Sequence, residues 1–440
     1  MSPDGGIMST TITEANLRQN PQEKPHVARC LRKALGFVDP LRKRELRNAT
    51  VKEVVRYLLD GYTPGESFQK IRDLKSQSAV AGNIGLYRTW RLRQIVESPH
   101  PFREMMTLFW LDVFAISALR MKDLGCYHAF CDGLEERSLA PWCDILAFAL
   151  EHPAFLLNLR AERNYRSMPN RQLGEFVVEH VMGRDPTQQQ ECANSVARSF
   201  TGLFARGAEL RRYDYEHDPG VKVIGNRSGD FWPRDVAQIL AQDAQVAAVL
   251  AGRLYRWFIA SEGDIPPGFL EPVVNQILSG RASGEIVAEA VVTWCTTGEP
   301  SARRVKSPLE VFLTLVRPFK GRVTTALTDL VAELGWDLLH PPTYAGWPKG
   351  RDWLTTAQLA RRISLAESLL LKEERFGGGI DLPAVARMVG YNDDWPGLLV
   401  DTLLDEGLPP GTKEIWERQV KRGPSEAVLF LVALPEFQLS

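Results

Sequence analysis

The sequence predicts an all-α protein: a single large multi-helical domain with long irregular loops and little or no sheet. Two observations predict this class. Apolar residues recur every three or four positions in one segment after another, which is the period of a helix face, and strand-like patterns are nearly absent. The 440 residues are 44% hydrophobic and 24% charged, so the chain has an ordinary globular composition and is long enough to bury a large core.

Composition also narrows the classes of function. The formal net charge is −1, so no overall attraction to nucleic acid or to a membrane surface is expected. Six cysteines occur without a C-x-x-C pair, which indicates reduced core thiols rather than a disulfide framework. Neither a secretory signal nor a run of 18 apolar residues is visible, so we expect a cytoplasmic protein without a membrane span.

The order of elements follows from apolar spacing and cap residues. Residues 1–25 are polar and predict a mobile N-terminal tail, which leaves 26–440 as the helical domain. The glycine triplet predicts a flexible joint near 376–380. Helices are predicted at 51–59, 102–119, 142–150, 154–159, 173–182, 187–203, 235–261 with a break near Asp243, 270–278, 285–295, from Pro308 onward, 324–334 and 355–374.

Two irregular segments interrupt this pattern. Residues 207–234 are rich in Gly, Asp and Arg and lack a helical period, with a short hairpin as one option within 213–224. Residues 340–356 contain three prolines, two glycines, two tryptophans and a tyrosine, so they predict a rigid aromatic loop between helices. Both segments are candidates for a site, because side chains on loops can converge.

The first candidate site is the polar cluster at 214–222. His217 and Asp218 offer the imidazole and the carboxylate that general acid–base catalysis uses, and Lys222 could hold an anion. The alternative is a solvated turn in which Asp218 caps the bend before Pro219 and Gly220.

The second candidate site is the aromatic loop. Tyr344, Trp347 and Trp353 could stack on a sugar or a base, while Lys349 and Arg351 could hold phosphate, sulfate or carboxylate. The alternative is that both tryptophans fill the helical core and that Arg351 pairs with an internal carboxylate.

The sequence gives little support for metal binding, nucleophilic catalysis or nucleotide binding. Neither the acidic pair in 173–182 nor the cysteines and histidine of 126–131 have the ligand pattern of a metal site. A nucleophile elbow, a P-loop and a dinucleotide-binding motif are also missing from the sequence. The sequence therefore predicts neither a metal nor a cofactor.

Several stretches occur in the order found in one family. They are FREMMTLFWLDVFAIS (102–117), HPAFLLNL (152–159), HDPGVKVIG (217–225) and HPPTYAGWPKGRDWLTT (340–356). From about residue 28 onward the chain resembles the bacterial family called domain of unknown function 1800. The resemblance implies a helical domain without an established activity. Members are often exported and encoded beside proteins resembling phosphatases or sulfatases, and His217, Asp218 and Lys222 match the family's His-Asp-x-Gly-x-Lys pattern.

The chain departs from the family pattern where a site would be expected. Leu111 and Val113 stand where the family usually has histidine, and Arg160 stands where it has an acid. We therefore expect a divergent, non-catalytic or accessory protein that binds a partner protein, such as one encoded nearby. The alternative is a hydrolase or transferase acting on a carbohydrate or anionic surface polymer through His217 and Asp218, which requires 214–222 and 344–353 to face one cleft.

Overall fold

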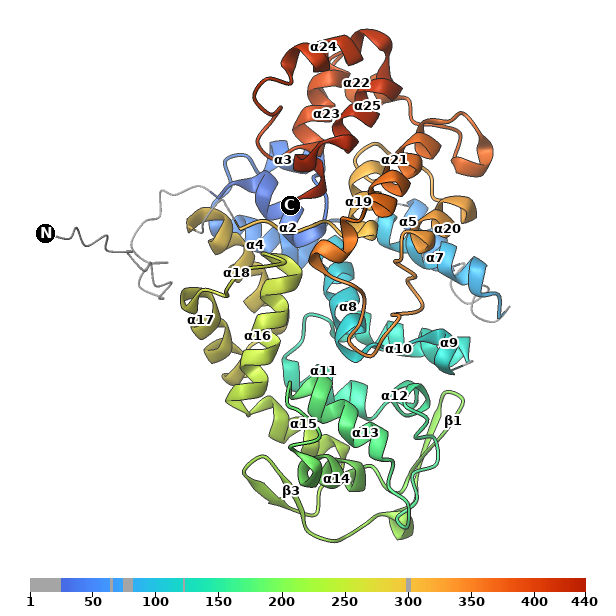
Figure 1. Ribbon diagram of the computed structural model, residues 1–440, viewed down its shortest axis with the longest axis vertical. Helices are drawn as coiled ribbons and strands as arrows, with labels where there is room; N and C mark the ends of the chain where they lie inside the picture. The colour runs from blue at the N-terminus through green and yellow to red at the C-terminus, as the bar shows by residue number, and fades with distance from the viewer. Residues whose placement is uncertain (1–24, 64–65, 74–81, 122, 298–301) are drawn as a thin grey trace, which may run out of the picture.

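The computed structural model describes residues 25–63, 66–73, 82–121, 123–297 and 302–440. The predicted all-α class is confirmed, because the described residues form helices with only two small two-stranded sheets. The molecule is elongated, with the C-terminal helices at one end and both sheets at the other (Figure 1). Nearly all of the predicted N-terminal tail lies outside the described residues.

The first helices pack at the middle of the molecule. The predicted helix at 51–59 is confirmed, and a capping box between Thr50 and Glu53 fixes its start. The bounds are α2 Val27–Leu35, α3 Pro40–Glu45, α4 Val51–Asp60, α5 Glu66–Asp73 and α7 Ile84–Glu97.

Helix α8 (Pro101–Phe114) is the central element. All of its residues except Arg103 are buried, so it is apolar around most of its circumference rather than on one face. The predicted helix at 102–119 extends too far, because Ala115 adopts a left-handed conformation with φ 47° and ends α8. The next helices are α9 Ala118–Met121, α10 Leu124–Arg137, α11 Trp142–Leu150 and α12 Pro153–Asn158.

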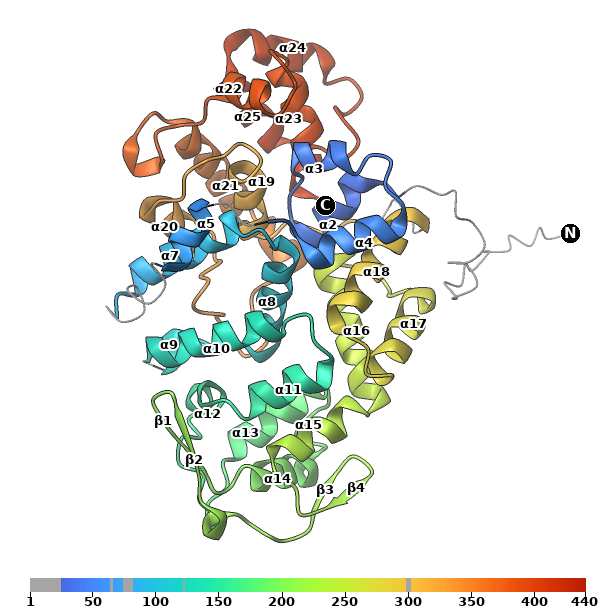
Figure 2. The same ribbon diagram turned by 180° about the vertical axis from the view of Figure 1, so that it is seen from behind.

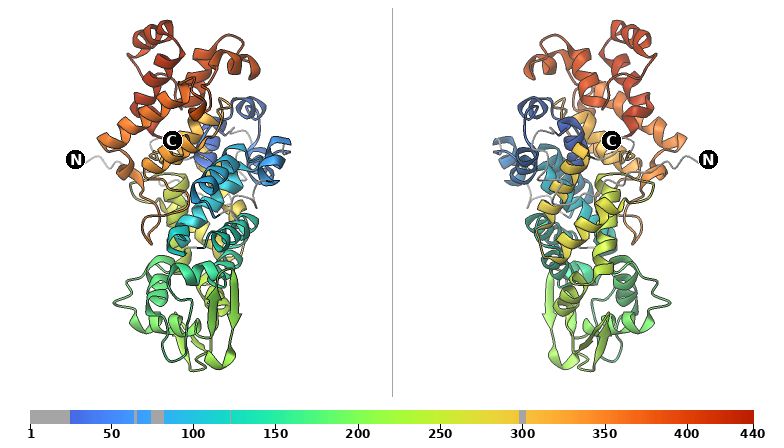
Figure 3. Two further views of the ribbon diagram at one scale, coloured as in Figure 1. Left: turned by 90° about the vertical axis from the view of Figure 1, so that its right-hand side faces the viewer. Right: turned by 90° about the vertical axis from the view of Figure 1, so that its left-hand side faces the viewer.

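The irregular segment 207–234 lies at the narrow end of the molecule (Figures 2 and 3). Two hairpins flank residues 213–221 instead of one hairpin within 213–224, because the polar run 214–218 forms a tight turn and not a strand. The helix predicted at 187–203 is shorter, since its last residues enter the first hairpin. The bounds are α13 Arg171–Phe176, the π-helical turn η1 Val177–Val181, α14 Gln190–Ser199, β1 Leu203–Arg206, β2 Glu209–Arg212, η2 Asp214–Glu216, β3 Lys222–Ile224 and β4 Arg227–Gly229.

The remaining helices confirm most of the predicted starts. Asp243 breaks the long helical pattern as expected and caps α16, Ser307 forms a capping box before α19, and Thr355 caps α21. Gly377, Gly378 and Gly379 all have positive φ. The bounds are α15 Pro233–Ala241, α16 Ala244–Phe258, α17 Pro267–Leu278, α18 Ser283–Thr297, α19 Pro308–Val316, α20 Thr325–Glu333, α21 Thr356–Leu370, α22 Leu382–Met388, α23 Trp395–Leu403, α24 Lys413–Arg422 and α25 Pro424–Ala433.

The length and apolar character of these helices bear on membrane insertion. Within the described ranges, none combines the length and the apolar character needed to cross a bilayer.

Candidate functional site

The structure brings His217 and Lys222 together around a carboxylate that the sequence analysis missed. Lys222 is fully buried, and its ammonium group donates to the Asp218 carbonyl and to the Asp230 carboxylate. His217 Nδ1 lies 2.9 Å from the Thr201 carbonyl, and Nε2 lies 2.9 Å from Asp230 Oδ1 and 3.2 Å from Lys222 Nζ. Both nitrogens of this buried imidazole are therefore engaged.

A ring stack closes the cluster. Trp232 lies against the His217 ring with centroids 3.7 Å apart and an interplanar angle of 13°. The Arg212 guanidinium lies 3.6 Å from the centroid of the same indole. We call His217, Lys222, Asp230 and Trp232 the polar lock, because they join the turn between the two hairpins, the second hairpin and the start of α15.

Asp218 has a separate partner. Arg198, from α14, donates to its two carboxylate oxygens at 2.7 and 3.1 Å, and the Gly220 N–H donates at 2.8 Å. The hydrogen bonds from Arg198 lower the pKa of Asp218 to about 2, so the carboxylate stays ionised near neutral pH. Asp218 thus caps the bend before Gly220, which is the alternative weighed from the sequence.

Asp230 is held in its ionised form as well. Burial alone would raise the pKa of Asp230, but hydrogen bonds from Lys222 and His217 outweigh it and keep the pKa below its ordinary value. Its carboxylate is 45% exposed, so the polar lock reaches solvent at this residue. In the sequence, the only feature that could have pointed to Asp230 as a site residue is its position as an isolated acid beside Phe231 and Trp232.

In the aromatic loop, Trp347 is part of the core. Its ring, 2% exposed, stacks on Trp336 at a centroid distance of 4.6 Å, and its indole N–H donates to the Asp337 carbonyl. The Trp347 backbone N–H donates to Asp112 Oδ1 at 2.8 Å. Gly346 has φ +91°, and a Cβ there would lie 2.0 Å from Asp112 Oδ1, so only glycine permits this close approach.

The other loop residues predicted to bind a ligand lie in different surroundings. Tyr344 packs on α13, where its hydroxyl accepts from Gln172 and its ring lies under the Arg120 guanidinium. Arg351 is 82% exposed and pairs with Glu262 at the surface, at 2.8 Å, rather than with an internal carboxylate. The loop therefore does not gather its aromatic and basic side chains at one exposed surface.

Lys349 and Trp353 line a cavity of about 280 Å³ between α8, α16 and the loop. Lys349 pairs with the buried carboxylate of Asp112 at 2.7 Å. No residue of 214–222 lines this cavity, and Figures 1 and 2 place that segment at the narrow end of the molecule, away from the loop. The shared cleft that the enzyme hypothesis requires is therefore not formed.

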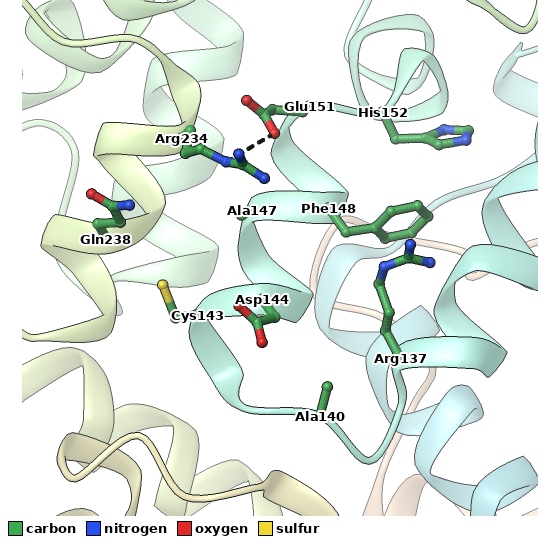
Figure 4. A pocket seen from close by; sticks show the side chains of 10 residues that line it. All are labelled: Arg137, Ala140, Cys143, Asp144, Ala147, Phe148, Glu151, His152, Arg234 and Gln238. Carbon is green, nitrogen blue, oxygen red and sulfur yellow. Dashed lines mark ion pairs between the residues drawn. The ribbon is translucent and has the colours of Figure 1, made fainter.

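A second hollow, of about 530 Å³, lies between α11 and α15 (Figure 4). Arg234 crosses it to Glu151 at 3.5 Å, and the ring centroid of His152, which also lines the hollow, lies 5.3 Å from that of Phe148. Burial lowers the pKa of His152 to about 4 and raises the pKa of the Cys143 thiol, so neither side chain is an activated catalytic group at neutral pH. Across the described ranges, three metal-ligating side chains never come together.

These features define a class: a helical protein with a tightly packed core, a closed polar lock and a cavity under an aromatic loop. The model of the DUF1800 family, described as a protein of unknown function, matches residues 12–439, so the chain belongs to this family and the resemblance is confirmed. Comparisons with curated proteins and with solved structures give no match.

Proposed function

We propose that the chain is a non-catalytic protein that binds a partner protein at the narrow end of the molecule. The observation that carries this proposal is a row of three exposed and two half-buried side chains, which we call the tyrosine patch: Tyr165, Met168 and Tyr215 are exposed, and Phe204 and Tyr213 are half-buried. Tyr215 is 75% exposed, Met168 70% and Tyr165 37%. Exposed apolar groups gathered in this way are typical of interaction surfaces, where tyrosine is enriched.

The geometry of the rings favours a protein partner over a sugar. Tyr165 contacts Phe204, Phe204 contacts Tyr213 and Tyr213 contacts Tyr215, with centroids 5.0, 5.2 and 5.8 Å apart. Successive planes are tilted by 81°, 89° and 63°, so the rings offer edges and faces in turn and not a flat stacking platform.

The backbone beneath the patch is firmly tied. The Gly202 N–H donates to the Asn164 carbonyl and the Tyr213 N–H to the Gly202 carbonyl, both at 2.8 Å. The polar lock and the Arg198–Asp218 pair fix the next residues. A surface that is ordered before binding loses little conformational entropy when a partner docks, which supports a role of the polar lock in shaping the patch.

The enzyme alternative has less support. A general acid–base pair needs groups that exchange protons with a substrate, whereas both nitrogens of His217 have partners and Asp218 remains ionised down to a pH of about 2. We therefore assign His217 and Asp218 to positioning the patch.

Site-specific photo-crosslinking in cells that express the protein tests this proposal. We expect a benzoyl-phenylalanine that replaces Tyr215 to give a discrete protein adduct. The same group at Met388, which is 65% exposed on α22 at the other end of the molecule, should give none. With the partner identified and purified, the double variant Tyr165→Ser, Met168→Ser should weaken its binding about tenfold or more. Equal adducts at both positions, or none at position 215, would contradict the proposal.

A further inference from the structure

The cavity under the aromatic loop contains a cation without a partner. Arg253 projects from α16 into its lining, and no hydrogen bond or ion pair joins the guanidinium to any residue that the structure describes. Burial lowers the pKa of Arg253, and the nearby carboxylate of Asp112 opposes this only in part. Arg253 is half-buried, so its guanidinium is partly withdrawn from water without a protein partner in exchange, and an anion in the cavity would supply that partner.

The neighbouring charges are already satisfied. Asp112 is paired with Lys349, and Arg304 with Glu310. Arg256 donates to the carbonyls of Ala260 and Gly263. Within the described lining, Arg253 is thus the one cation with neither an ion pair nor a hydrogen bond to a protein group.

Two indole N–H groups in the same lining also lack hydrogen-bond partners. The N–H groups of Trp257 and Trp336 are buried and have no acceptor among the described residues. Their rings form a continuous aromatic wall with Phe109 and Trp353, with centroid distances of 5.7 Å (Phe109–Trp257), 6.0 Å (Trp257–Trp336) and 6.1 Å (Trp336–Trp353). The wall offers ring faces to a ligand, and a ligand with oxygen acceptors would satisfy the two N–H groups.

We propose that this cavity binds a small ring-bearing carboxylic acid. Its carboxylate forms a bidentate pair with the guanidinium of Arg253, and its ring lies against the indole wall. Its remaining oxygens accept hydrogen bonds from the indole N–H groups of Trp257 and Trp336. One free cation matches a single negative charge, so a dianion would leave a charge uncompensated in a site of low dielectric constant. A volume of about 280 Å³ admits one sugar acid or one bicyclic aromatic acid and excludes a polymer.

Ligand titrations test the proposal. Glucuronate and indole-3-acetate present the same carboxylate on a sugar ring and on an aromatic ring, and the three lining tryptophans report binding through their fluorescence. We expect at least one acid to bind more tightly than its neutral analogue, glucose or indole-3-acetamide, by about tenfold or more. Which acid binds better identifies the ring. The proposal is overturned if neither acid binds, if the neutral analogues bind equally well, or if inorganic phosphate binds as tightly as the better acid.

Substitutions in the lining test whether the acid binds in this cavity. Arg253→Met keeps the side-chain length and removes the charge, so the acid should lose its advantage over the neutral analogue. Gly252→Leu should abolish binding, because Gly252 lines the cavity and a Cβ there meets only Ile265, at 3.4 Å. Arg351→Met is the matched control: it removes a surface guanidinium and should bind like the parent. Thermal unfolding confirms that each variant is folded. Full acid binding by folded Arg253→Met would overturn the assignment.

Discussion

The polar lock and the cavity each hold a basic side chain, fully buried at Lys222 and half-buried at Arg253, and they differ in whether that side chain has partners. Lys222 donates to the Asp218 carbonyl and to the Asp230 carboxylate, and its ammonium group lies 3.2 Å from His217 Nε2. Arg253 uses none of its donors on any residue the structure describes. A satisfied buried cation stabilises the fold and has little capacity left for a ligand, whereas an unsatisfied one lowers stability and remains available. By this criterion the cavity, and not the motif with His217, is the better binding site.

Replacing Lys222 should have the largest effect. Lys222→Met leaves the Asp218 carbonyl without a donor inside the protein and removes the buried cation beside the Asp230 carboxylate, and we expect the free energy of unfolding to fall by about 3 kcal/mol. Urea unfolding measures the change. Arg211→Met removes a cation from the exposed pair with Glu209 in the same segment and should leave the free energy of unfolding almost unchanged. Equal effects of the two substitutions would show that the polar lock does not stabilise the fold.

Replacing Arg253 should raise the free energy of unfolding rather than lower it. Arg253→Met removes an uncompensated guanidinium and places an apolar side chain beside the indole wall, so we expect the ligand-free protein to gain about 1 kcal/mol. The same unfolding experiment, without added acid, gives the value. A loss as large as that of Lys222→Met would mean that Arg253 supports the core, and the contrast between the two regions would fail.

The smallest effect concerns the Arg198–Asp218 pair. The pKa of Asp218 in the folded protein, about 2, lies below the ordinary value of 3.8, so the unfolded chain binds the proton first. The stabilisation is therefore complete above a pH of about 4 and is lost as the pH falls through about 2. We expect Asp218→Asn to cost about 0.5–1 kcal/mol at neutral pH, because the pair is partly exposed, and to cost nothing at the lowest pH. Unfolding curves of both proteins across this range measure the difference. A difference that does not change with pH would contradict the assignment.

Much of the fold could be predicted from local signals. The break near Asp243 and the helix from Pro308 could be predicted, because a side chain that caps a helix acts on backbone groups a few residues away. The end of α8 at Ala115 was missed, because the apolar pattern continues past it and only packing enforces the left-handed conformation.

The site could be predicted only in part. His217, Asp218 and Lys222 are close in sequence and were expected to lie together, whereas Arg198 and Asp230 come from outside the motif. For the aromatic loop both alternatives were open, and packing placed Trp347 in the core and Trp353 in the cavity wall.

The sequence by itself determined the helical class, most helix starts and membership of the DUF1800 family, because these depend on periodicity, caps and ordered motifs within the chain. Only the tertiary structure decided which polar groups would find partners. Asp112 meets Lys349 through the approach of the loop to α8, and nothing in the α16 pattern distinguishes Arg253, left alone, from Arg256, which finds carbonyls. The partner of a buried charge is set by contacts between distant segments, and that pairing separates a structural residue from one available to a ligand.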